Sequence, residues 1–331
     1  MSERPSSMGR RRVIARGLVL AAVPAAPLAG CALAAPRRAE GLAPGVFMLQ
    51  GQPGEVDERT LGRIGNGGFI VGERGVLVVD TGVSAREGRE RLEAIEAVTK
   101  LPVRLAILTH ARQEYVFGSA PFRERGIPIA MQAQAAKLMK ARCDGCLKTL
   151  NRVLGEEAMR GTAMFEPDLA FDDAAAISMQ ASTAIGRPVR VLSYGHSSGP
   201  GDTAVLDEAS ATLFAGGLID HRRIPDVQDA ELPGWRRALE ALGTLAPRRI
   251  VPGHGPVGGP QAVAEVQRYL DRLEARLLAL LQADAALSEV PDAASLPGYE
   301  TWDQYAIVHR RNASILFVRM ERDQLMKGNE G

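Results

Sequence analysis

The sequence predicts an α/β sandwich with helices on its outer faces. Short apolar runs rich in β-branched residues alternate with longer amphipathic segments. The order of a β-rich segment, a helix, a strand and a helix occurs twice along the chain. The chain has 331 residues, of which 46% are hydrophobic, 24% charged and 5% aromatic. This composition is typical of a globular protein and excludes wholesale disorder, collagen and coiled coil.

The first 30 residues are predicted to be an export signal. Arg10, Arg11 and Arg12 precede an uncharged stretch over residues 17–30, as in the charged and apolar parts of a signal peptide. An arginine pair before two apolar residues resembles a twin-arginine signal, which exports folded proteins. No apolar run reaches the roughly 18 residues that a membrane-spanning helix needs.

A cysteine follows the apolar stretch and is a candidate for lipidation. Leu28-Ala29-Gly30-Cys31 resembles a bacterial lipobox, in which the Cys is acylated and begins the mature chain. The alternative is a plain signal peptide, cleaved after the run Ala32-Leu33-Ala34. Residues 31–43 are rich in Ala, Pro and Arg and are predicted to be a tether. We expect a periplasmic lipoprotein that is anchored to the membrane through Cys31 without spanning it.

The charge of the remaining chain argues against one class of partner. Residues 1–30 hold five Arg and one Glu, so the rest of the chain carries a net charge near −3. A weakly acidic body gives no electrostatic reason to expect nucleic-acid binding.

The first half of the body alternates strands and helices. A helix is predicted over residues 84–99, with Ser84 as its N-cap and Glu87 three residues on. A second helical segment, over 132–155, carries two cysteines. The predicted strands span residues 69–71, 76–79, 103–108 and 127–130.

The second half of the body has the same kinds of element. Residues 164–187 are acidic and Ala-rich and give no clear prediction. Strands are predicted at 189–193, 204–206, 212–214 and 250–251, and helices at 232–245, 260–282 and about 302–325. The helix over 260–282 is the clearest, because Val263, Val266, Leu270, Leu273, Leu277 and Leu281 fall on one stripe.

Four loops that follow strands carry polar residues in recognisable settings: residues 78–82, 108–118, 194–203 and 251–255. In this order and spacing they resemble the metallo-β-lactamase superfamily over residues 44–258. The resemblance implies an αββα sandwich with a metal site at one edge, between the two sheets. It also implies hydrolysis of an ester, thioester, amide or phosphodiester with zinc or iron. Residues 132–187 would then be a helical insertion and residues 259–331 a C-terminal helical extension.

Further motifs resemble one subgroup, the quinoprotein relay system zinc metallohydrolase family. They are Arg223-Ile224-Pro225-Asp226, Trp235, Pro252-Gly253-His254-Gly255, Tyr305 and Arg311-Asn312. This resemblance implies an exported protein that accompanies periplasmic quinoprotein dehydrogenases.

The ligand motif departs from the superfamily pattern. The usual loop is His-x-His-x-Asp-His, whereas this chain has His110-Ala111-Arg112-Gln113-Glu114-Tyr115. His196 and His254 match the later metal histidines, and Gly217 stands where a bridging Asp is expected. A hydrolytic zinc site needs three protein ligands and an open position for water. An ordinary dinuclear zinc site is therefore not expected.

A rearranged mononuclear site is the first hypothesis. His110, His196, His254 and Glu114 offer imidazoles and a carboxylate, which suit zinc or iron. Asp220 or His221 could also join this site, although both lie a few residues past the expected place of a ligand.

In such a metallohydrolase a metal-activated water would attack a carbonyl group. Glu114 or Asp202 would accept a proton, and Arg112 or Tyr115 would stabilise the oxyanion. The resemblance implies that Asp80 lies behind the ligands and orients a histidine. Asp202 is also predicted to cap or orient the loop of His196.

The second hypothesis is a non-catalytic accessory protein. The cleft histidines, Arg112 and Tyr115 offer many hydrogen-bond donors, and Arg binds carboxylate or phosphate in a fork. A cleft of this kind would bind a small anion or a quinone-like acid without metal. A third interpretation, in which the histidines only form hydrogen bonds within a decayed cleft, stays open beside it.

Cys143 and Cys146 form a C-x-x-C pair with several interpretations. In an oxidised compartment a local disulfide is the first expectation. The pair could instead replace lost metal ligands, or be redox-active. His309, beside Arg310 and Arg311, is predicted to be a surface residue.

Overall fold

The computed structural model describes residues 38–328 of the chain. The predicted signal, Cys31 and the first part of the predicted tether lie outside the described residues. The end of the predicted tether belongs to the fold, because Glu40–Ala43 form strand β1 and pair with β2. No helix of the described part of the chain is both long and apolar enough to cross a membrane.

The first sheet has seven strands in sequence order, from β1 to β7. Its first four strands pair antiparallel, and β4 to β7 pair parallel. The strands are β1 (Glu40–Ala43), β2 (Val46–Leu49), β3 (Gly67–Val71), β4 (Val76–Val79), β5 (Val103–Leu108), β6 (Ile129–Gln132) and β7 (Leu169–Phe171). The parallel pairing places the loops after β4 and β5 at one edge of the sheet.

The second sheet has four strands in the order β11-β10-β9-β8. Strands β8, β9 and β10 pair antiparallel, and β11 pairs parallel to β10. The strands are β8 (Val189–Ser193), β9 (Thr203–Asp207), β10 (Thr212–Asp220) and β11 (Arg249–His254). Two cleft residues, Asp220 and His254, are the last residues of β10 and β11 and face each other in the register.

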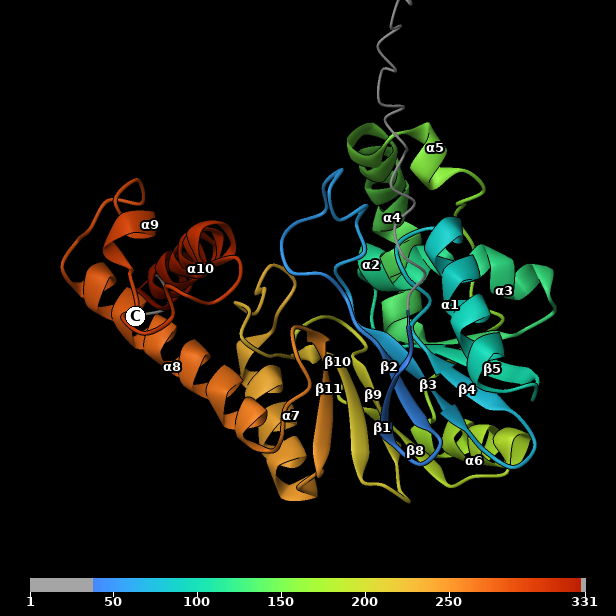
Figure 1. The fold of residues 1–331 in the computed structure, drawn as a ribbon. Helices are drawn as coiled ribbons and strands as arrows, with labels where there is room; N and C mark the ends of the chain where they lie inside the picture. The colour runs from blue at the N-terminus through green and yellow to red at the C-terminus, as the bar shows by residue number, and fades with distance from the viewer. Residues whose placement is uncertain (1–37, 329–331) are drawn as a thin grey trace, which may run out of the picture. The chain divides into compact units, whose positions relative to one another are not determined.

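Helices cover the outer faces of both sheets (Figure 1). The first sheet carries α1 (Ala85–Val98), α2 (Gln113–Val116), the 3₁₀ turn Phe117–Ser119, α3 (Ala120–Glu124), α4 (Ala133–Leu154) and α5 (Glu156–Met159). The second sheet carries α7 (Leu232–Leu245) and α8 (Gln261–Gln282). The unassigned segment 164–187 folds as β7 and as α6 (Ala174–Ile185), which packs against β8 and β5.

Buried side chains form an apolar layer between the two sheets. Val79 and Ile107 of the first sheet pack against Val205, Phe214 and Val251 of the second. Because each sheet has a further apolar core under its own helices, the protein is an αββα sandwich, as the sequence predicted. Burial of these layers is the main favourable contribution to folding.

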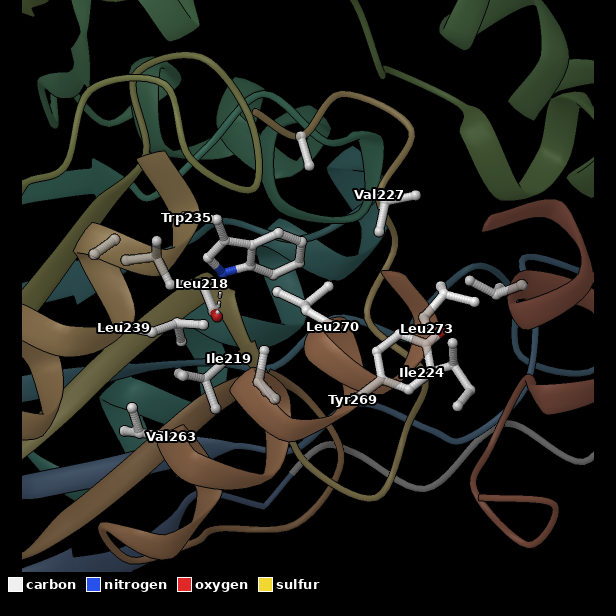
Figure 2. Close-up of a cluster of buried hydrophobic side chains, with 14 of the residues drawn as sticks. Leu218, Ile219, Ile224, Val227, Trp235, Leu239, Val263, Tyr269, Leu270 and Leu273 are labelled. Atoms are coloured by element: carbon white, nitrogen blue, oxygen red, sulfur yellow. Dashed lines mark hydrogen bonds between the residues drawn. The ribbon is translucent and has the colours of Figure 1, made fainter. Parts of the chain in front are cut away.

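The core under α7 and α8 extends to the C-terminal helices. Trp235 is fully buried, and its indole Nε1 donates a 3.0 Å hydrogen bond to the carbonyl of Leu218 (Figure 2). The extension continues with α9 (Val290–Ala293), a π-helical turn (Tyr305–His309) and α10 (Arg310–Gly328). The prediction that His309 lies on the surface is wrong. Its ring is buried, lies 3.1 Å from the hydroxyl of Tyr269 and bonds the carbonyl of Ala294.

Candidate functional site

Loops from both sheets meet at one edge of the sandwich and line a cleft of about 390 Å³. Its walls come from the loop after β5, the ends of β10 and β11, α4 and α10. The charged and thiol side chains in its lining are Glu55, Arg112, Glu114, Arg142, Cys146, Asp220, Arg223, Asp226, Asp229, His254 and Arg311. The cleft is therefore rich in both signs of charge.

His254 is buried and lies between two carboxylates. Its Nδ1 is 2.8 Å from Oδ1 of Asp220, and its Nε2 is 3.2 Å from Oε1 of Glu114. Burial disfavours the charged ring, but the two carboxylates outweigh burial and raise the pKa of His254 above its usual value. Burial likewise opposes ionisation of Glu114, yet His254 and Arg112 lower the pKa of Glu114 to about 2. The geometry is that of an imidazolium bridging two carboxylates.

Arg112 adds a second, permanent cation beside this group. Its guanidinium donates a 3.0 Å hydrogen bond to the carbonyl of Asp226 and lies 3.9 Å from the carboxylate of the same residue. The carboxylate of Asp226 also bonds Arg311 at 2.7 Å. One carboxylate thus faces two guanidiniums, while the carboxylates of Glu114 and Asp220 add negative charge near Arg112.

Tyr115 occupies the space behind His254. Its hydroxyl donates to the carbonyl of Gly253 at 2.8 Å and lies 3.2 Å from the ring nitrogens of His254. The side chain is fully buried, and burial raises the pKa of its phenol well above the usual value. Tyr115 is therefore a neutral positioning group for His254 in this geometry.

His110 has a different environment. Its Nδ1 lies 2.8 Å from the hydroxyl of Thr109, whereas its Nε2 is buried and has no hydrogen-bond partner within residues 38–328. Burial, followed by the charge of Arg112, lowers the pKa of His110 well below its usual value. His110 is therefore neutral, in contrast to His254.

Asp80 acts on His110 through Thr109. Its carboxylate accepts hydrogen bonds from the backbone N–H and the hydroxyl of Thr109, between 2.8 and 3.1 Å. Burial raises the pKa of Asp80 to about 7, although these hydrogen bonds oppose the shift. The contact to the histidine that the resemblance implied is thus mediated by a hydroxyl.

Asp202 holds the loop of His196. One carboxylate oxygen accepts from the hydroxyls of Ser197 and Ser198 and from the backbone N–H of Gly199. His196 itself is exposed, and its Nε2 lies 2.7 Å from the carbonyl of Asp229. The ring of His196 is engaged away from His110 and His254, so these three predicted ligands are not brought together.

Comparison with known proteins identifies the family. Residues 60–254 match the profile of the family described as "Metallo-beta-lactamase superfamily", which is more than half of the chain. The chain belongs to this superfamily. A search of curated proteins finds no match. The fold and the family together make it a hydrolase-like protein of metallo-β-lactamase type.

Solved structures share the superfamily fold. A metallo-β-lactamase from Pontibacter korlensis is 19% identical, with a TM-score of 0.57, and the match covers 71% of this chain and 99% of that one. The mono-zinc form of the metallo-β-lactamase FIM-1 from Pseudomonas aeruginosa is 22% identical, with a TM-score of 0.55 and coverage of 72% and 96%. The structure of TMB-1 is 15% identical, with a TM-score of 0.55 and coverage of 72% and 98%.

The superfamily implies a metal, and we tested the cleft residues against it. Within residues 38–328, no three His, Cys, Asp or Glu side chains are grouped so that they could hold a metal ion. A Cβ atom at Gly217, where the superfamily has a bridging Asp, would lie 2.6 Å from Nε2 of His110. With Arg112 in a ligand position and both nitrogens of His254 bonded to carboxylates, the donor set does not fit the superfamily's metal site.

Sequence reasoning left Asp220 outside its ligand set, although this residue contacts His254 directly. The available signal was a carboxylate at the end of an apolar strand. The prediction missed it because β10 extends six residues beyond the predicted end of the strand, to Asp220.

The two cysteines lie in α4, where Cys146 lines the cleft and Cys143 is buried in the apolar core. Both are free thiols, so the structure does not contain the disulfide that was the first expectation. A hydrogen bond from Cys143 lowers the pKa of Cys146 to about 7, against the effect of burial. The same hydrogen bond, together with burial, raises the pKa of Cys143.

Proposed function

We propose that this member of the superfamily binds a small organic anion in its cleft without a metal ion. The observation that carries the proposal is the position of His254 between Asp220 and Glu114, with Arg112 beside them. An imidazolium and a guanidinium here supply the positive charge that a metal ion supplies in other members.

Metal binding at His254 would have to reverse this arrangement. A metal ligand must be a neutral imidazole with a free nitrogen, so His254 would lose a proton and a hydrogen bond to a carboxylate. The permanent charge of Arg112 would then lie close to the metal and repel it. Both costs oppose metal binding at His254.

The two guanidiniums at Asp226 favour an anion. Arg112 and Arg311 share the carboxylate of Asp226, and their side chains are 16% and 43% exposed. A carboxylate of the ligand could therefore bond one guanidinium in a fork while Asp226 keeps the other.

A mononuclear metallohydrolase is the second candidate, and one observation favours it. Nε2 of His110 is buried without a hydrogen-bond partner in the described chain, which is unusual for a polar group. The superfamily fold supports hydrolysis in general. The two candidates differ in whether His110 contacts a metal or the bound anion.

The proposal extends to location and partners. The arginine cluster and the lipobox-like sequence support an exported lipoprotein, anchored through Cys31 in the periplasm. The motifs shared with the quinoprotein relay family support a role beside a periplasmic quinoprotein dehydrogenase. A quinone-like carboxylic acid would then be a suitable ligand.

Elemental mass spectrometry and calorimetry test the proposal together. We expect far less than one zinc or iron per chain, and measurable heat on titration with aliphatic or aromatic carboxylates. Arg112→Gln should weaken binding by about tenfold, because it removes a charge-assisted fork. Arg236→Gln is the matched control, since Arg236 is a paired arginine on α7, outside the cleft lining.

The opposite result would favour the second candidate. One tightly bound zinc or iron per chain that is lost in His110→Ala would contradict a metal-free cleft. Equal carboxylate binding by Arg112→Gln and Arg236→Gln would contradict the anion site.

A further inference from the structure

A pair of thiols lies in the wall of the cleft and has no role in the proposed anion site. Cys143 is 1% exposed and packs in the apolar core beneath α4. Cys146 is partly exposed and lines the cleft beside Arg142 and Thr149. A molecule in the cleft can thus reach the sulfur of Cys146 directly, but not that of Cys143.

The spacing of the pair allows a disulfide to form after a local adjustment of the helix. Residues three apart in an α-helix have Cα atoms about 5 Å apart. This lies within the range of roughly 4.4–6.8 Å that disulfides require. Both thiols are free in the structure, so the pair is described in its reduced form.

Gly145, between the two cysteines, faces open space. A Cβ atom at this position would meet no atom within 4 Å, so packing does not require a glycine there. Glycine inside a helix costs about 1 kcal/mol relative to alanine. The conformational freedom of glycine allows this part of the helix to adjust when a disulfide closes.

The two thiols are not equivalent as nucleophiles. The hydrogen bond from Cys143 favours the thiolate of Cys146, and the charge of Arg142 has a smaller effect in the same direction. Cys143 stays protonated. The thiolate is the form that attacks disulfides. The exposed sulfur is therefore also the more reactive one.

We propose that Cys143 and Cys146 form a redox-active dithiol that exchanges with small disulfides entering the cleft. The Cys146 thiolate attacks one sulfur of the disulfide, the S–S bond breaks, and one half leaves as a thiolate that takes up a proton. Cys143 then loses its proton to solvent and attacks the mixed disulfide at Cys146, which expels the second half. The chain gains the Cys143–Cys146 disulfide by losing two electrons, and the small disulfide is reduced to its two thiols.

The charge of the cleft indicates which disulfides are preferred. Arg142 lines the cleft beside Cys146 in an ion pair with Asp229, and Arg112 and Arg311, which share Asp226, line the same cleft. A disulfide with carboxylate groups should therefore react faster than a neutral or cationic one. This preference rests on the proposed anion site, whereas the exchange itself depends only on the cysteine pair.

Three small disulfides of similar length test the exchange reaction and the charge preference separately. The full chain with Cys31→Ser would be mixed with dithiodipropionate, hydroxyethyl disulfide or cystamine, which are anionic, neutral and cationic. Released thiols and modified cysteines would be followed by absorbance and mass spectrometry. We expect the anionic disulfide to react about tenfold faster than the cationic one at low salt, and the difference to shrink at high salt.

The matched variants Cys143→Ser and Cys146→Ser test the roles of the two sulfurs. Cys143→Ser should stop at a stable mixed disulfide on Cys146. Cys146→Ser should react at least about tenfold more slowly, because the remaining thiol is buried and protonated. Both substitutions remove one sulfur from the same helix turns, so a shared folding defect would not produce this asymmetry.

Three outcomes would overturn the proposal. They are equal reactivity of the two variants, a disulfide in the purified chain that excess reduced glutathione does not open, and thiols that are held by a tightly bound metal. If exchange with the neutral disulfide follows the expected order of steps but the charge preference is absent, the anion site is contradicted and the redox pair stands.

Discussion

Two of the three histidines that match the superfamily's metal histidines, His110 and His254, are both nearly fully buried, yet the pKa values of their rings shift in opposite directions. His110 contacts a hydroxyl and leaves Nε2 without a partner in the described chain. His254 is bonded to a carboxylate at each nitrogen. Burial lowers the pKa of an imidazole, and only a nearby opposite charge can reverse this effect. The difference shows that neighbouring carboxylates, not depth in the protein, decide where positive charge is held in the cleft.

The largest expected difference between His254 and His110 is in what each contributes to the stability of the protein. His254→Ala leaves Asp220 and Glu114 buried without the cation between them, which should cost about 3–5 kcal/mol of unfolding free energy. His110→Ala removes the contacts of Nδ1 with the hydroxyl of Thr109 and the backbone N–H of Gly217, together with some packing, and should cost about 1–2 kcal/mol. Urea unfolding at neutral pH measures both values. Equal losses in the two variants would contradict the difference in charge.

The contributions of His254 and His110 should change the stability of the protein with pH in opposite directions. The raised folded pKa of His254 means that its stabilisation is complete below the unfolded pKa and is lost as the pH rises through the folded pKa. The lowered folded pKa of His110 means that stability falls as the pH drops below the unfolded pKa, because the unfolded chain takes up the proton first.

Two variants separate these contributions. His254→Gln should flatten the loss of stability above about pH 6.5, and His110→Gln should flatten the loss below it, each by at most about 1.4 kcal/mol per pH unit. Urea unfolding between pH 5 and pH 9 gives the slopes. If both variants change the pH dependence of the unfolding free energy in the same pH range, the account is contradicted.

The smallest expected effect concerns the support of His110. The folded pKa of Asp80 is raised to about 7, so its protonated form favours folding and stability falls as the pH rises from the unfolded pKa towards 7. Asp80→Asn should remove this slope and cost about 1 kcal/mol or less at acidic pH, where the native side chain is also neutral. A loss that is larger at pH 8 than at pH 5 would show that Asp80 is ionised in the folded state.

Most of the fold could be predicted from the sequence, because it follows from apolar periodicity and caps. The strands at Val76–Val79 and Val103–Leu108 and the helix α7 have the predicted bounds. The N-cap of α1 is Ser84, which accepts a hydrogen bond from the backbone N–H of Glu87. The segment 164–187 was not assigned, because α6 has an Ala-rich sequence with a weak apolar stripe.

The residues of the site could be listed from the sequence, but their partners could not. Loop motifs placed Glu114 and His254 in one cleft, whereas the bridge through Asp220 depends on the length and register of β10 and β11. The direction of the His196 ring depends on a carbonyl from a loop 33 residues further on. Such contacts are set by tertiary structure and have no periodic signal in the chain.

The central claim is that an imidazolium at His254, rather than a metal ion, carries positive charge in the cleft. Nitrogen NMR of the histidine rings at pH 7 tests it most directly, since the chain has five histidines that single substitutions can assign. The account predicts that both ring nitrogens of His254 carry protons and that His110 is neutral, with no change on addition of zinc. A neutral His254 whose signal shifts with one equivalent of zinc would contradict it.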